Sequence, residues 1–189
     1  MVERVRAFIA IDVEDPIVLS RLVSVRDLFV STGVPMKPVE RSNMHITLRF
    51  LGEIPVSLVD EIYGLMRELV FSVFEARVVG VGAFPSSVRP RVIWAGVREG
   101  GERIEEIYRF LEKGLRRLGF RPEREEFVPH ITLARLKGRR NIERVVRLLE
   151  EYRDYEFGVF RVESIRLKQS ILTRSGPIYR TLREVRASR

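Results

Sequence analysis

The chain contains only two histidines, and both begin the same tetrapeptide, His-Ile-Thr-Leu, at positions 45–48 and 130–133. In an extended strand, residues two positions apart face the same way. Each histidine therefore shares a face with the threonine that follows it, while the isoleucine and leucine face the other side and can anchor the strand in a core. The repeat predicts two equivalent strands, each with an imidazole and a hydroxyl on its polar face.

The segments around the two copies predict a similar succession of elements in each half of the chain. Strands and helices alternate irregularly, which favours an α+β fold over a doubly wound parallel sheet. No low-complexity linker separates the halves, so residues 1–189 are expected to form one domain of two lobes that share an interface. Hydrophobic periodicity places strands at 5–12, 44–51, 75–82, 92–97, 155–160, 164–170 and 178–185, and helices at 16–29, 57–71, 104–118 and 142–152.

A pseudo-twofold relation between the halves would bring the two polar pairs to face each other across one cleft. Displacement at phosphorus requires a base for the attacking oxygen and an acid for the leaving oxygen. Two imidazoles can fill these roles near neutral pH without a metal if one is neutral and the other protonated. We therefore take His45 and His130 as candidate catalysts. Thr47 and Thr132 are candidate hydrogen-bond donors to the non-bridging phosphate oxygens.

Composition excludes several other kinds of site. The chain has no cysteine, which rules out disulfides, thiolate metal ligands and cysteine nucleophiles. The two histidines are far apart in sequence and no tight acidic cluster accompanies them, so we expect neither a metal nor another cofactor. No apolar run reaches the roughly 20 residues that a membrane span needs, and the first residues do not resemble a signal peptide. We expect a cytoplasmic protein without a membrane partner.

The chain is strongly basic, with a formal net charge of +8. Its 34 basic residues include only four lysines. Because the planar guanidinium pairs with two phosphate oxygens at once and stacks on bases, the arginine surplus favours a nucleic acid or a nucleotide as partner. Adaptation to heat or a biased genome composition also enriches charged residues, so charge alone does not decide between these explanations.

The motifs resemble those of the two-histidine (2H) phosphoesterase superfamily, whose signature is a pair of HxTx sequences. Within it, the chain is similar to the RNA 2′,3′-cyclic phosphodiesterases, the LigT-like proteins that are also called 2′-5′ RNA ligases. The resemblance implies a bilobal α+β fold, with two pseudo-symmetric lobes of antiparallel sheet and outer helices around a central cleft. The segments that carry it are RAFIAI at 6–11, NMHITLRFLG at 43–52, PRVIW at 90–94, FVPHITLAR at 127–135 and GPIY at 176–179.

The resemblance also implies a reaction, namely the metal-independent hydrolysis of an RNA 3′-terminal 2′,3′-cyclic phosphate to a 2′-phosphate. Carried over residue by residue, His45 would be the proton donor to the departing 3′ oxygen. His130 would be the proton acceptor that activates water. Thr47 and Thr132 would bind the phosphate oxygens.

The family further implies a role for an arginine after the second motif, which here is Arg135. Simple alternation places Arg135 on the face opposite His130, so it reaches the cleft only if the strand bends or bulges. Otherwise it is a surface arginine. Arg49 follows the first motif and has the same parity as His45 and Thr47, although the family assigns it no strong role.

The predicted site also includes an aromatic residue. By resemblance, Phe8 would stack on the terminal base, and the alternative is that Phe8 is a core side chain. Trp94 and Tyr179 are expected to be packing residues rather than ligand contacts.

Three functions fit these observations. The leading hypothesis is a cyclic phosphodiesterase that acts on RNA ends or on small cyclic nucleotides. A module that binds RNA or a nucleotide without chemistry would use the same threonines and arginines. A reversible 2′-5′ RNA ligase would run the same chemistry backwards, although water at roughly 55 M favours hydrolysis unless the cleft excludes it. We expect a monomer.

Overall fold

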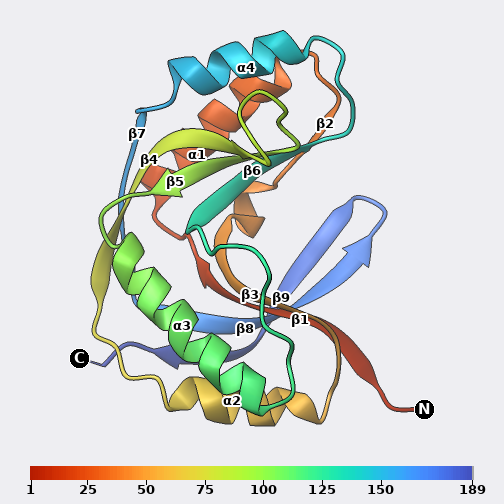
Figure 1. The fold of residues 1–189 in the computed structure, drawn as a ribbon, viewed down its shortest axis with the longest axis vertical. Coiled ribbons are helices and arrows are strands. Elements are labelled where there is room, and N and C mark those ends of the chain that lie inside the picture. Colours follow the sequence, from red (N-terminus) through yellow and green to blue (C-terminus); the bar gives the residue numbers. More distant parts are fainter. Residues whose placement is uncertain (189) are drawn as a thin grey trace.

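The computed structural model describes residues 1–188, and the order of its elements is shown in Figure 1. Strands and helices alternate much as the sequence predicts, with end points that differ by a few residues. The strands are β1 (Arg4–Asp12), β2 (Met36–Pro38), β3 (His45–Pro55), β4 (Phe74–Phe84), β5 (Val92–Val97), β6 (His130–Leu136), β7 (Glu156–Val162), β8 (Ser164–Thr173) and β9 (Gly176–Arg186). The helices are α1 (Pro16–Val30), α2 (Leu58–Arg67), α3 (Gly101–Arg117) and α4 (Ile142–Glu151).

The strands form one curled antiparallel sheet in the order β7-β4-β5-β6-β3-β1-β8-β9, with β2 paired to β6. Two groups of four strands meet at its centre, where β3 and β6 are joined by the single residue pair Ile46–Ile131. We call the group β1, β3, β8 and β9 the first lobe and the group β4 to β7, with β2, the second lobe. They are the lower and upper halves of Figure 1. The predicted α+β fold with two lobes of antiparallel sheet is confirmed.

The helices cover the outer faces of the lobes, and the chain crosses between lobes to place them (Figure 1). Helix α1 follows β1 of the first lobe but packs on β2, β6 and β7 of the second. Helix α3 follows β5 of the second lobe but packs on β3 and on α2 of the first. Neither lobe is therefore one continuous piece of chain, and the apolar core runs through both.

Local sequence signals explain where helix α1 begins. The Asp15 carboxylate accepts hydrogen bonds from the backbone N–H groups of Ile17 and Val18 at 3.0 and 2.9 Å. These bonds satisfy donors that a helix N-terminus leaves free, and proline at the first helical position has a preset φ. The side chains on one face of the helix, at Val18, Leu22 and Val25, are buried in the core.

Strand β2 was not predicted from the sequence. It has only three residues and ends at Pro38, so it shows no alternating pattern to detect. It exists because it pairs with β6, with Lys37 opposite Arg135. Strand β3, by contrast, extends beyond its predicted end at Leu51. Gly52 adopts a left-handed φ of 74°, and the strand continues through it to Pro55.

Two helical glycines provide a test of the packing between α2 and α3. A β-carbon at Gly114 of α3 would overlap the buried side chain of Leu65 in α2, whereas one at the exposed Gly64 would meet nothing within 4 Å. Gly114→Ala should lower the free energy of unfolding by about 1–2 kcal/mol, because overpacking outweighs the helix propensity gained. Gly64→Ala is the matched control and should raise it by about 0.5–1 kcal/mol. Urea unfolding measures both changes, and equal effects of the two substitutions would contradict this packing.

Candidate active site

The two repeated motifs meet at the junction between the lobes. Continuing the antiparallel register from the Ile46–Ile131 pair places His45 opposite Thr132, and His130 opposite Thr47. Both isoleucines are fully buried, so the four polar side chains project from the other face of the sheet, into the cleft. The Cα atoms of diagonal neighbours in such a pair lie about 7–8 Å apart, which leaves room for a phosphoryl group between the two imidazoles.

Both imidazoles are held in the same way. Nδ1 of His45 donates to the carbonyl oxygen of Asn43, and Nδ1 of His130 donates to that of Val128, each at 2.6 Å. A carbonyl can only accept, so Nδ1 carries a proton in both rings and Nε2 is the atom left for chemistry. Nε2 of His45 lies 2.9 Å from the Thr47 hydroxyl. The two motifs thus present equivalent ring nitrogens.

Burial lowers the pKa of both histidines below the ordinary value of about 6.5. In His45 the hydrogen bond to the Asn43 carbonyl offsets part of this effect. In His130 the bond to Val128 does the same, while the charge of Arg135 lowers the pKa further. Both rings are consequently neutral near pH 7 in the free protein, and a bound anion is needed to favour protonation of one of them.

Two aromatic side chains surround each imidazole. The rings of Phe8 and Tyr179 lie 5.2 and 5.4 Å from the ring of His45. The ring of Phe84 contacts His130 edge-on at 4.9 Å, and Trp94 lies behind it. These contacts desolvate the imidazoles and restrict their rotation. Phe8 is only 2% exposed, and the edge of Tyr179 lies over it at 4.9 Å.

The pairing register shifts in each motif strand directly after the threonine. Leu133 has no partner in β5, where Thr132 pairs with Trp94 and the next pair is Ala134–Ile93. Such a bulge reverses the alternation. Arg135 therefore faces the cleft, which strict alternation along the strand would not allow.

The equivalent shift in the first motif corrects the prediction for Arg49. Leu48 has no partner in β1, so Arg49 turns to the opposite face and Phe50 takes the place in the cleft. Arg49 is buried there. Its guanidinium bonds Glu112 of α3 at 2.6 Å and Glu123 at 2.7 Å. The prediction that Arg49 shares a face with His45 and Thr47 was wrong, because the alternation of side chains is interrupted at the bulge.

The cleft contains a cavity of about 260 Å³. Its walls come from both lobes, and none of its lining residues is a carboxylate. It holds five of the six predicted site residues, namely Phe8, His45, Thr47, Thr132 and Arg135. His130, the sixth, is placed beside it by the pairing described above.

Other cavity residues were not predicted from the sequence, among them Arg6, Phe50 and Tyr179. Phe50 is 44% exposed, and the guanidinium of Arg6 lies 4.7 Å from its ring centroid. Tyr179 lines the cavity rather than only packing behind it. The segments RAFIAI and GPIY already contained Arg6 and Tyr179, but an isolated strand pattern does not show which strands will be neighbours.

A polar network supports His45 from the side of β1. Asp12 is the cross-strand partner of His45, and its carboxylate accepts from Lys168 at 2.7 and 2.8 Å and from Arg166 at 2.6 Å. Lys168 is 6% exposed. Burial by itself raises the pKa of the Asp12 carboxyl, but the hydrogen bonds from the two cations outweigh it, so this pKa lies below its usual range.

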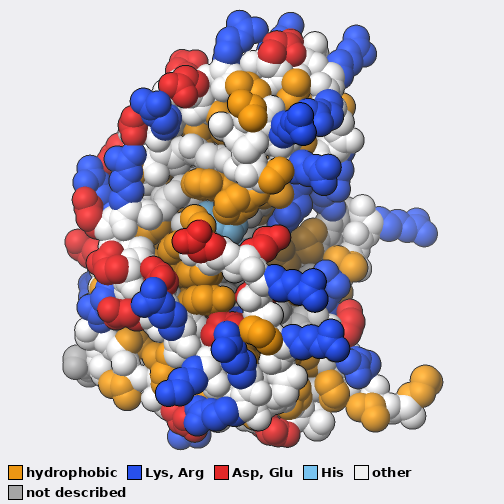
Figure 2. Space-filling model, in the orientation of Figure 1, with side chains coloured by type: hydrophobic (Ala, Val, Ile, Leu, Met, Phe, Trp, Pro, Cys, Tyr) orange, Lys and Arg blue, Asp and Glu red, His pale blue; other side chains and the backbone are white. Residues whose placement is uncertain are grey.

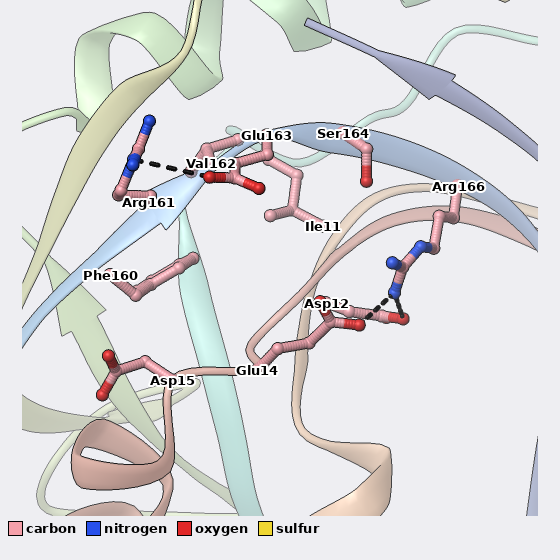
Figure 3. Close-up of a pocket in the computed structure, with 10 residues that line it drawn as sticks. All are labelled: Ile11, Asp12, Glu14, Asp15, Phe160, Arg161, Val162, Glu163, Ser164 and Arg166. Carbon is pink, nitrogen blue, oxygen red and sulfur yellow. Dashed lines mark hydrogen bonds and ion pairs between the residues drawn. The ribbon is translucent and has the colours of Figure 1, made fainter.

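Figure 3 shows the outer side of this network, where Arg166 points toward Asp12 and Glu14 in a second cavity of about 220 Å³. None of the predicted site residues lines that cavity. Within residues 1–188, no group of three or more His, Asp or Glu side chains is placed to hold a metal ion. In the same part of the chain, no helix is both long and apolar enough to cross a membrane.

The sequence model of the family described as LigT-like phosphoesterase matches residues 20–94 and 96–179. The chain belongs to this family. Two similar proteins, both named RNA 2′,3′-cyclic phosphodiesterase, are those of Aeropyrum pernix and Archaeoglobus fulgidus. The Aeropyrum pernix protein is 50% identical, and the match covers 90% of this chain and 97% of that protein. The Archaeoglobus fulgidus protein is 42% identical, and the match covers 94% of this chain and 98% of that protein.

Solved structures of LigT-like phosphoesterases and of related proteins share the fold. A crystal structure of a Thermus thermophilus protein superposes with a TM-score of 0.80, at 29% identity, over 96% of this chain and 97% of that one. Escherichia coli LigT in complex with 3′-AMP superposes with a TM-score of 0.73 at 21% identity, over 99% of this chain and 100% of that one. At that identity the likeness concerns the fold alone.

The Asp12–Lys168 pair generates a prediction about stability. Asp12→Asn leaves a buried ammonium without its counter-charge, so it should lower the free energy of unfolding by about 3–5 kcal/mol at pH 7. Because the folded-state pKa of Asp12 is depressed, the carboxylate stabilises the fold above its unfolded pKa of about 3.9, and this contribution is lost as the pH falls.

Denaturant unfolding of both proteins between pH 7 and pH 3 measures this difference, which should shrink below about pH 4. Asp154→Asn is the control, since its carboxylate pairs with Arg98 on the surface, and it should have little effect. A deficit for Asp12→Asn that stays constant down to pH 3 would contradict the ion-pair account.

Proposed function

We propose that this protein hydrolyses RNA 3′-terminal 2′,3′-cyclic phosphates to 2′-phosphates, without a metal or another cofactor. The observation that carries the proposal is the geometry of the two motifs. Two imidazoles present their Nε2 atoms to one cleft, from strand positions that lie opposite the threonine of the other motif. This arrangement supplies an acid and a base on opposite sides of one phosphorus atom.

The reaction uses the two histidines in opposite protonation states. His130, with a neutral Nε2, accepts a proton from water as the water oxygen bonds to phosphorus. His45, protonated on Nε2, donates its proton to the 3′ oxygen as the bond between that oxygen and phosphorus breaks. The negative phosphate raises the pKa of the adjacent imidazole and so favours this protonated state. The order of the roles follows the family resemblance.

The rest of the cavity suits an anion. The hydroxyls of Thr47 and Thr132 can donate to the non-bridging oxygens, and Arg135 adds a charge-assisted bond to them. Because no carboxylate lines the cavity, nothing there repels the phosphate. The names of the relatives support a cyclic phosphate as substrate, and E. coli LigT is described in complexes with 3′-AMP and with phosphate.

Phe8 is still proposed to stack on the terminal base, although the structure requires a movement before the base can reach its ring. Since its ring is almost fully covered, a base can reach it only if one of the covering rings moves. Tyr179 is the side chain that can do so, because it is only half-buried and comes from the edge strand β9.

The other two functions use the same cavity. A non-catalytic binding module would bind the same ligands and release no product. A 2′-5′ ligase would admit an RNA hydroxyl in place of water. Water at roughly 55 M favours hydrolysis over ligation unless the cleft excludes it.

Removing either imidazole should abolish turnover without unfolding the protein. His45→Ala and His130→Ala should each lower kcat by at least about 10²-fold on a cyclic-phosphate-ended oligonucleotide, because each removes an acid or a base. The thermal midpoint should change little, since both rings face the cleft. Ser24→Ala, at an exposed position of α1 outside the cavity, is the control and should keep wild-type activity.

Product analysis by chromatography measures these rates, with excess EDTA present in a parallel series. Near-native turnover in either histidine variant would remove that residue from the mechanism. Loss of wild-type activity in EDTA would contradict the metal-free reaction, and ligand binding without any product would favour the binding module.

A further inference from the structure

Most of the net positive charge of the chain comes from three short segments of the second lobe. Residues 35–39, 85–93 and 127–142 contain no Asp or Glu at all. They contain seven Lys or Arg residues, which are Lys37, Arg89, Arg91, Arg135, Lys137, Arg139 and Arg140. Outside these segments the net charge of the chain falls from +8 to +1. The excess charge therefore belongs to one region rather than to the whole surface.

The pairings of β6 bring the three segments together. Arg135 is paired with Lys37 of β2 on one side and with Val92 of β5 on the other. Just beyond, the N–H of Leu136 donates to the carbonyl of Arg91, and the N–H of Lys137 donates to that of Pro35. In Figure 1, β2, the loop before β5 and the loop after β6 lie on one side of the upper lobe. We call the seven side chains the basic rim.

The basic rim is exposed and carries no internal counter-charge. All seven residues are exposed, and none forms an ion pair with an Asp or Glu within residues 1–188. Elsewhere many arginines are paired, such as Arg77 with Glu99 and Glu156. Like charges gathered in one region of a protein repel one another, so this arrangement disfavours the free protein and favours a bound polyanion.

Arg135 connects the rim to the catalytic cavity, because it belongs to both. Figure 2 shows Lys and Arg side chains beside the hollow in which a histidine is visible. A chain whose terminal phosphate lies between the two histidines would therefore pass over cations as it leaves the cavity on this side.

We propose that the basic rim binds the phosphodiester backbone of the RNA segment that precedes the cyclic end. This inference rests on the proposed function and deepens it, because it makes a polynucleotide, rather than a mononucleotide, the preferred substrate. The forked guanidinium groups suit successive phosphates, and such contacts add affinity without reading the base sequence. The rim thus acts on substrate length and leaves the chemistry to the cavity.

The test removes three rim charges that lie outside the cavity. The variant Lys137→Gln/Arg139→Gln/Arg140→Gln is compared with Lys113→Gln/Arg116→Gln/Arg117→Gln on α3, which lowers the net charge by the same amount at another exposed site. Each protein is assayed on 2′,3′-cyclic AMP and on a ten-nucleotide RNA with a 2′,3′-cyclic end. Affinity for the same RNA with a 2′-phosphate end is measured by fluorescence anisotropy between 50 and 300 mM salt.

The rim variant should raise KM and Kd for the RNA by about tenfold, and leave kcat/KM for 2′,3′-cyclic AMP within twofold of wild type. The slope of log Kd against log salt concentration should fall by about 2, because three phosphate contacts on a single strand are lost. The α3 variant should match wild type on both substrates.

Several outcomes would overturn the proposal. These are an unchanged Kd for the RNA in the rim variant, an equal loss in the α3 variant, or wild-type affinity no higher for the RNA than for 2′-AMP. Loss of binding to phosphatidylserine vesicles with unchanged RNA affinity would instead assign the rim to a membrane surface. If the wild type hydrolyses neither substrate, the proposed function fails, and the anisotropy comparison still decides the role of the rim.

Discussion

The contact between β3 and β6 is the constraint on which the rest of the structure depends. A single antiparallel residue pair, Ile46–Ile131, links the strands of the two lobes and fixes the register of both motifs. A slip of one residue would turn the imidazoles into the core and the isoleucines into the cleft. The burial of both isoleucines opposes such a slip, so hydrophobic packing on one face of the sheet determines the geometry of the proposed catalytic groups on the other.

The bulges after the two threonines give the cleft its specific lining. Each bulge reverses the alternation of side chains along its strand. As a result, Phe50 and Arg135 occupy equivalent places on the two sides of the pseudo-twofold axis. The difference between an aromatic ring and a cation at these places makes a symmetric scaffold asymmetric. Arg49, turned away by the first bulge, connects β3 to α3 and to the segment that leads to His130, since it also bonds the carbonyl of Arg121.

The sequence predicted what depends on short-range periodicity. The repeated tetrapeptide has a period of two and a polar face, so the motif strands and the common face of His45 and Thr47 could be derived without the structure. The bulges could not, because Leu48 and Leu133 are ordinary strand residues and only the pairing with β1 and β5 reveals the extra residue. For the same reason Arg49 was assigned to the wrong face. The basic rim was not visible either, since its segments lie far apart in sequence and only β6 brings them together.

The central claim is that His45 and His130 act from opposite sides on one cyclic phosphate. The most direct measurement is the position of the phosphate in the product of a cyclic-phosphate-ended oligonucleotide, determined by ³¹P NMR. Protonation of the 3′ oxygen by His45, with water activated at His130, predicts a 2′-phosphate as the sole product. A 3′-phosphate, or a mixture of the two, would contradict the account, because the departing oxygen would then not be fixed beside His45.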